Sequence, residues 1–154
     1  MTENNDATQP ALVVNGQYVK DLSFEVPGAP AIYNEMQGRN PEIAIHVDIN
    51  ASGVAENVFE VVLHLKVEAS SESKAVFIAE LAYGGVFTLH VPQEHLQAML
   101  LIECPRMLFP FARAIVADMT RDGGFPPLMI QPIDFVQLFR SRMEAAAQQP
   151  EGTA

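Results

Sequence analysis

The feature that most constrains the fold is an alternation of apolar and polar side chains in the segment 59–69. A repeat of two residues is the period of a β-strand, and it places alternate side chains on one face. The apolar residues on that face are Phe59, Val61, Leu63, Leu65, Val67 and Ala69. The pattern recurs less completely in 18–26, 42–49 and 76–83. Four strands that are each apolar on one side predict an antiparallel sheet with one covered face.

The connections between these strands differ in length. SSES (70–73) predicts a short hairpin turn between the third and fourth strands. The segment 27–41 contains three prolines and two glycines, so we expect a long crossover loop there. Gly84-Gly85 follows the fourth strand pattern and predicts a bulge or bend.

Helical patterns follow after Pro92. We expect one helix over 93–103, a second that Pro105 opens and that ends near Gly123-Gly124, and a last one over about 133–146. The Pro-rich stretch 125–132 predicts a loop. The fold class is therefore α+β: a four-stranded antiparallel sheet with a long crossover loop, followed by C-terminal helices packed on one face. We expect one domain over 12–144, with disordered tails over 1–11 and 145–154.

The chain is acidic, with a formal net charge of −10 over 154 residues. Such a charge disfavours binding to nucleic acids and anionic membrane surfaces and favours basic partners. The alternative is that the charge serves only to keep the protein soluble. Neither a signal peptide nor an apolar run of membrane-spanning length is apparent, so we expect no stable membrane insertion. A single cysteine, Cys104, cannot form an intrachain disulfide, which favours a cytoplasmic protein.

No group of residues predicts catalysis. The four histidines, His46, His64, His90 and His95, lack metal-ligand spacing, so we expect neither a metal nor a cofactor. Glu103 directly precedes Cys104 and would raise the pKa of its thiol, which disfavours a nucleophile. No phosphate-binding or nucleophile-elbow motif occurs, and we expect no enzyme.

Two surface features indicate binding instead. Asp21 and Glu25 share one face of the first strand, and Ile78 and Glu80 share the less apolar face of the fourth. If those strands are neighbours, they form an acidic patch with an apolar centre; the alternative is an ordinary solvated sheet face. The supply of apolar residues also exceeds what a lone small domain covers, which indicates self-association or a groove for an apolar partner.

Three strings resemble the SecB protein-export family. They are YVKDLSFEVPGAP (18–30), AYGGVFTL (82–89) and CPRMLFPFARAIVADMTRDGGFPPLMIQPIDFVQLF (104–139). The resemblance covers roughly residues 12–143. It implies a homotetramer, built as a dimer of dimers, that binds unfolded precursor proteins without ATP and delivers them to the SecA ATPase.

The resemblance also implies roles for particular residues. SecA contacts would fall on Asp21, Glu25, Ile78 and Glu80. The oligomer interface would include Ala79, Leu81 and Tyr83. Candidates for the client groove are Ile32, Tyr33, Ile43, Ile45, Val47, Phe135 and Phe139. Two alternatives stay open: a SecB-like chaperone dedicated to another client such as an antitoxin, and a small-molecule binding domain.

Overall fold

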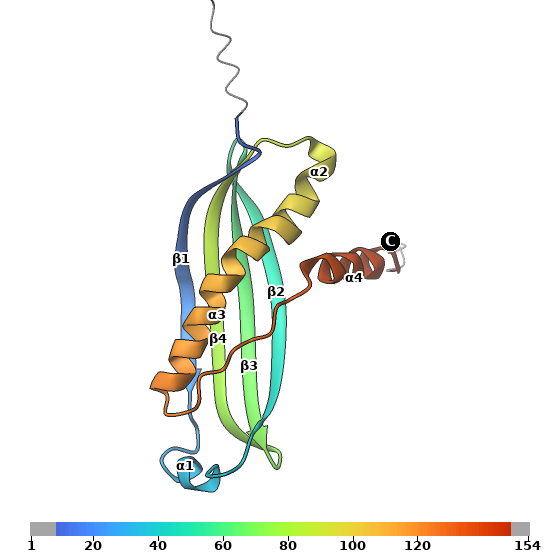
Figure 1. The fold of residues 1–154 in the computed structure, drawn as a ribbon. Coiled ribbons are helices and arrows are strands. Elements are labelled where there is room, and N and C mark those ends of the chain that lie inside the picture. The colour runs from blue at the N-terminus through green and yellow to red at the C-terminus, as the bar shows by residue number, and fades with distance from the viewer. Residues whose placement is uncertain (1–8, 149–154) are drawn as a thin grey trace, which may run out of the picture.

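The computed structural model describes residues 9–148 and contains one four-stranded sheet (Figure 1). The strands are β1 (Leu12–Glu25), β2 (Glu42–Ala55), β3 (Val58–Ser71) and β4 (Lys74–Leu89). They lie in the order β1-β4-β3-β2, and every neighbouring pair is antiparallel. The hairpin turn between β3 and β4 is two residues long, and Glu72 and Ser73 both have positive φ, as in the turns that suit the twist of a hairpin.

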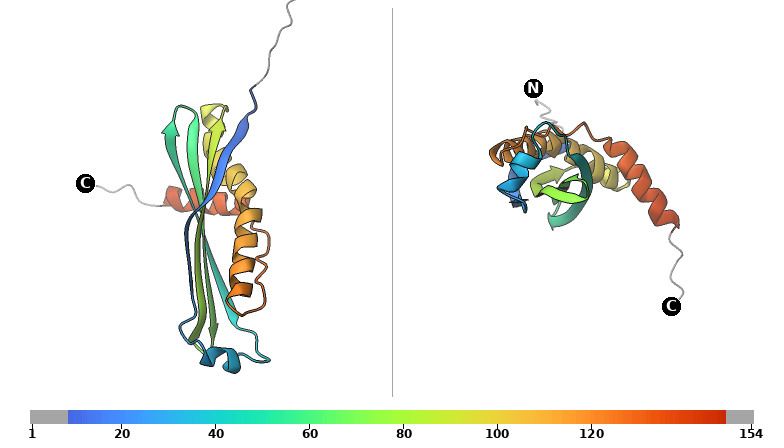
Figure 2. Two further views of the ribbon diagram at one scale, coloured as in Figure 1. Left: turned by 90° about the vertical axis from the view of Figure 1, so that its left-hand side faces the viewer. Right: turned by 90° about the horizontal axis from the view of Figure 1, so that it is seen from below.

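The helical segment 93–122 lies on one face of the sheet, so the molecule has two layers there (Figure 2). Helix α2 (Gln93–Ala98), a π-helical turn η1 (Met99–Glu103) and α3 (Cys104–Asp122) form one rod that crosses the sheet diagonally. Helix α4 (Phe135–Gln148) projects sideways beyond β2. The predicted α+β class, with an antiparallel sheet and helices on one face, is confirmed.

Two boundaries differ from the sequence-based expectation. The crossover between β1 and β2 contains a short helix, α1 (Ala31–Glu35), where we expected only loop. Helix α4 continues to Gln148, so residues 145–148 are helical instead of tail. The rest of the expected tails, apart from residues 9–11, lies outside the described residues.

The backbone hydrogen bonds of the rod change from the α-helical to the π-helical pattern directly before a proline. Pro105 has no N–H to donate, and its ring would crowd the carbonyl one turn earlier. In η1 the N–H of Cys104 bonds to the carbonyl of Met99, five residues back, which widens the helix directly before Pro105. This local widening lets α2 and α3 continue as one rod where the sequence suggested two separate helices.

The bulge or bend predicted at Gly84-Gly85 does not interrupt the strand, because β4 continues through both glycines and its pairing shows no register shift there. The irregularities lie on the partner strand, β1, between Val14 and Gly16 and between Val19 and Asp21. The second bulge turns Tyr18 to the outer face of the sheet, away from the helices, where its ring lies on Gly84 and its hydroxyl donates to Glu60. The alternation in 18–26 predicted that Tyr18 shares the apolar face with Leu22 and Phe24, and this prediction is wrong.

The core lies between α3 and the inner face of β3 and β4. Leu63, Leu65 and Val67 are buried on β3, and Leu108, Ala112 and Val116 are buried on α3. This burial explains the strict alternation of the third strand, since every second side chain is removed from water. Within residues 9–148, the helices are too short or too polar to cross a membrane.

Candidate functional site

The outer face of the sheet, which no described helix covers, carries the predicted acidic residues (Figure 2). Strand β1 lies beside β4, as the patch required. The register pairs Glu25 with Ile78 and Ser23 with Glu80, and Asp21 lies opposite the small Ala82. Asp21, Glu25, Ile78 and Glu80 therefore form one surface, which we call the outer patch.

Strand β3 adds charged residues to this surface that sequence reasoning missed. The register of the β3–β4 hairpin places Lys66 opposite Glu80 and Glu68 opposite Ile78. The Nζ atom of Lys66 lies 3.2 Å from Glu68 Oε1 and 3.5 Å from Glu80 Oε1. The short SSES turn indicated that the third and fourth strands form a hairpin, and so that Lys66 and Glu68 lie beside the fourth strand. The pairing also needs a bulge at Ala69–Ser70, which the turn alone does not predict.

These contacts change the pKa of Lys66. Its hydrogen bond to Glu68, followed by the negative charges of Glu68 and Glu80, raises the pKa of the Lys66 ammonium. A lysine is protonated at neutral pH even without this shift, so the outer face carries a positive charge between its carboxylates.

The inner face of β2 is an exposed apolar strip, because α3 covers β3 and β4 and leaves this edge strand open. Ile43, Ile45 and Val47 follow one another along it at every second position, and the next residue of the row, Ile49, is buried. Ile43 and Ile45 are each 38% exposed although they sit on the apolar face. We call this strip, together with the hollows at its two ends, the β2 groove.

The lower end of the β2 groove is a hollow of about 680 Å³ between the crossover segment and the loop after α3. Its apolar lining comprises Tyr33, Met36, Ile43, Phe77, Phe125 and Leu128. The hydroxyl of Tyr33 donates to the Gly123 carbonyl at 2.7 Å, and the N–H of Leu128 donates to Thr120 Oγ1 at 2.8 Å. These two hydrogen bonds hold the loop wall in place.

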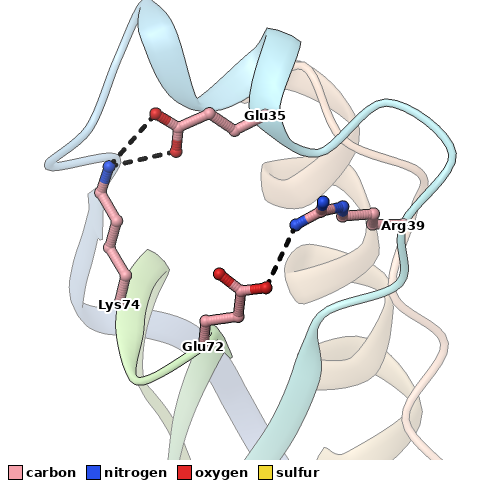
Figure 3. A network of polar contacts seen from close by, with 4 residues as sticks. All are labelled: Glu35, Arg39, Glu72 and Lys74. Carbon is pink, nitrogen blue, oxygen red and sulfur yellow. Dashed lines mark hydrogen bonds and ion pairs between the residues drawn. The ribbon is translucent and has the colours of Figure 1, made fainter.

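The opposite wall is tied to the β3–β4 hairpin by two ion pairs (Figure 3). Lys74 Nζ lies 3.1 Å from Glu35 Oε2, and Arg39 Nη1 lies 3.5 Å from Glu72 Oε1. Both pairs join the crossover segment to residues at the tip of the hairpin. We call them the crossover clamp.

The upper end of the β2 groove is a second hollow, of about 330 Å³, between β2, η1 and α4. Its lining includes Val47, Ile49, Leu101, Leu138 and Phe139. Arg142 Nη1 donates to the Ile49 carbonyl at 2.9 Å and so joins α4 to the edge strand.

The predicted groove residues thus fall into two groups. Tyr33 and Ile43 line the lower hollow, Val47 and Phe139 line the upper one, and Ile45 lies between them on β2. The other two candidates, Ile32 and Phe135, are buried in the core and support the walls from behind. Sequence reasoning missed the residues from the loop after α3, although the apolar and Pro-rich string FPPL marked that loop as unable to join a sheet.

The residues predicted for the oligomer interface lie on the inner face of β4. Ala79, Leu81 and Tyr83 are buried within the single chain. Their neighbours at the surface are exposed instead: Val19 lies opposite Tyr83 and Leu22 opposite Leu81 on the edge strand β1. The Phe111 ring stacks on Tyr83 at a centroid distance of 6.3 Å and is 52% exposed. Val19, Leu22 and Phe111 form what we call the β1 strip.

Cys104 has the character of a core side chain. It is fully buried, and burial followed by the charge of Glu103 raises the pKa of its thiol to about 12. A thiol in that state is a poor nucleophile. In the described part of the chain, no three His, Cys, Asp or Glu side chains converge as metal ligands would.

The fold defines the class of protein, an α+β domain with a four-stranded antiparallel sheet and a helical layer on one face. The structure resembles a SecB-like chaperone of Mycobacterium tuberculosis, solved in complex with a peptide of the HigA1 antitoxin, with a TM-score of 0.64. The sequences are 16% identical, and the match covers 80% of this chain and 91% of that one. The likeness establishes the architecture alone.

Sequence comparison identifies the family within that class. The family model described as preprotein translocase subunit SecB matches residues 5–146. A protein-export protein SecB from Paramagnetospirillum magneticum is 66% identical over 141 residues, 91% of each chain. Another from Rhodospirillum rubrum is 53% identical over 148 residues, 96% of this chain and 92% of that one. The chain belongs to the SecB family of protein-export chaperones, as the sequence resemblance predicted.

Proposed function

We propose that this protein binds unfolded precursor proteins in the β2 groove, keeps them competent for translocation without ATP, and delivers them to the SecA ATPase in the cytoplasm. The observation that carries the proposal is the exposed apolar strip on β2, with a hollow at each end, in a member of a protein-export family. An unfolded chain offers the extended apolar segments that such a strip can accept.

The proposed activity needs no catalytic group. A protein that binds only the unfolded form of a client shifts the client's folding equilibrium by mass action. Several weak contacts along one chain add through effective concentration, so moderate affinity at each hollow is sufficient. The family is one of chaperones, in keeping with the expectation that the chain is not an enzyme.

The outer patch is the proposed contact with SecA. Three carboxylates around Ile78 suit a basic surface, because charges steer encounter while an apolar centre lengthens residence. The outer patch and the β2 groove lie on opposite faces of the sheet. A client and the ATPase could therefore bind at the same time.

The β1 strip is the proposed interface between copies of the chain in a homotetramer. It places exposed apolar side chains beside an edge strand whose backbone groups lack a neighbour in the single chain. An edge of this kind is a template for pairing with a second copy. Ala79, Leu81 and Tyr83 would then support the interface from beneath.

The groove is tested by Ile45→Asp, which places a charge on an apolar strip residue that is already partly exposed. We expect a folded protein that suppresses aggregation of a reduced, unfolded precursor poorly, since an unpaired charge disfavours apolar contact. Val54→Asp is the matched control, because Val54 is a 61% exposed apolar residue of the same strand outside both hollows. Equal suppression by Ile45→Asp and the wild type would remove β2 from the client site.

The relatives favour general export over one dedicated client. Those at 50–66% identity are all named protein-export protein SecB, whereas the antitoxin-bound chaperone shares only 16%. A small-molecule site would require convergent polar groups. The linings of the two groove hollows are mainly apolar instead.

A further inference from the structure

Lys66 stands at the centre of the outer face, in the row of residues that crosses the sheet through Glu80. That row contains Ser23 on β1, Glu80 on β4, Lys66 on β3 and His46 on β2. The side chains of Lys66, Glu68 and Glu80 are all close to half exposed. A partner that docks on the outer patch would therefore meet the ammonium group of Lys66 together with the carboxylates.

The other basic side chains on this face contact other groups. Lys20 Nζ lies 2.8 Å from Glu60, away from the outer patch. His46 approaches only Glu68, at 4.0 Å, and His64 Nε2 lies 3.0 Å from the amide nitrogen of Asn50. Over residues 9–148, the one ion pair that a carboxylate of the outer patch makes is the pair between Glu80 and Lys66.

We propose that Lys66 is an affinity- and specificity-determining residue of the SecA docking surface. Its ammonium pairs with the Glu80 carboxylate until a basic side chain of the partner replaces it. The inference rests on the proposed docking of SecA at the outer patch. Docking is then an exchange of ion pairs, in which one internal pair is lost when an intermolecular pair forms. The ammonium of Lys66 also repels every approaching cation, which slows encounter.

This arrangement selects among partners. A lysine of the partner gains little by displacing Lys66, since one ammonium replaces another at the same carboxylate. An arginine gains more, because its planar guanidinium binds a carboxylate through two parallel hydrogen bonds. Lys66 therefore favours a partner that presents arginine at the position of Glu80 and disfavours nonspecific basic chains.

The test is a substitution that should strengthen binding. Lys66→Met keeps an unbranched stem and removes the charge, and we expect SecA to bind about threefold to tenfold more tightly at about 0.05 M ionic strength. The gain should shrink at about 0.5 M, where exposed charges are screened. Calorimetry with purified SecA measures both affinities. A gain in binding cannot arise from a general structural defect.

Three controls make the outcome specific. Lys66→Arg keeps the charge and should bind SecA no more tightly than the wild type, because its guanidinium holds Glu80 at least as well as the ammonium does. Arg106→Met makes the same change of net charge on α3, at an exposed side chain that pairs with Glu103 outside every proposed binding surface, and should leave SecA affinity unchanged. Asp21→Ala with Glu80→Ala removes two carboxylates of the outer patch and should weaken SecA binding while preserving client binding.

The outcomes separate the inference from the proposed function. If the double variant loses SecA affinity but Lys66→Met binds no more tightly than the wild type, Lys66 does not control docking. An equal gain in Arg106→Met would show that net charge alone causes the effect, and would overturn the inference as well. If the double variant binds SecA normally, the docking surface itself is wrong and the role of Lys66 fails with it. Should Lys66→Met fold poorly, Lys66→Gln tests the same charge removal.

Discussion

Gly84 and Gly85 show how closely two layers can approach at single residues. A Cβ atom on Gly84 would lie 2.9 Å from the Tyr18 ring, on the outer face. A Cβ atom on Gly85 would lie 2.9 Å from Leu108 Cδ2 of α3 and 2.8 Å from Phe87 Cε2, on the inner face. The pair is therefore required by packing on both sides of an unbroken strand, and not by a bend.

The packing at Gly85 predicts a loss of stability on substitution. In Gly85→Ala the new methyl group meets Leu108 and Phe87, both fully buried and unable to retreat, so we expect about 1–3 kcal/mol of destabilisation. Gly53→Ala is the matched control, since nothing lies within 4 Å of its added Cβ. Urea unfolding measures both, and equal midpoints for the two variants would contradict the close approach of α3.

Cys104 provides a probe of global opening. Because the thiol is buried and its pKa is raised to about 12, we expect no reaction with a thiol reagent at about pH 8 while the protein is folded. In concentrated guanidinium chloride the single thiol should react fully. Colorimetric thiol counting makes the measurement, and rapid labelling of the native protein would show that the α3 start opens locally.

At the scale of elements, the crossover clamp predicts that one charge reversal weakens client binding to the β2 groove and that a second, compensating reversal restores it. Lys74→Glu breaks the pair with Glu35 and places two carboxylates side by side, which should loosen the groove wall. We expect client affinity to fall about twofold to fivefold, since a looser wall must be ordered on binding. The charge-swapped double variant, Glu35→Lys with Lys74→Glu, should restore it.

Titration of a fluorescent unfolded precursor can decide this prediction. The double variant carries the same two charges in exchanged positions, so recovery isolates the interaction between them from the effect of each substitution. If the single and double variants bind equally weakly, the charges act separately and the clamp does not position the wall.

For the whole molecule, the β1 strip predicts an effect on assembly. Phe111→Asp should convert the expected tetramer into smaller species, because an unpaired charge would be buried between copies. Leu81 is a poorer test site, since a charge there would enter the core of the single chain. Light scattering gives the mass, with Val54→Asp as the exposed apolar control. A tetrameric Phe111→Asp protein would exclude Phe111 from the interface.

The sequence by itself determined where the strands lie, that helices follow them, and which face of β3 is apolar. These features are local, because the orientation of a side chain depends on its own backbone and on the period of its neighbours. The alternation in 59–69 therefore predicted the buried face of β3, and the stripe before Gly123 predicted α3. The strings that resemble SecB predicted the family in the same way, from residues close together along the chain.

Only the tertiary structure decided which strands are neighbours and in which register. The placement of β1 beside β4 brings Asp21 and Glu80 onto one surface, and a bulge in β1 moves Tyr18 to the outer face. Lys66 meets Glu68 and Glu80 through a hairpin register that one bulge shifts. The diagonal course of α3 buries Leu81 and leaves Ile45 exposed, although both occupy apolar strand positions. Each result depends on contacts between distant segments, and a single added residue in one strand reverses which side chains face the partner.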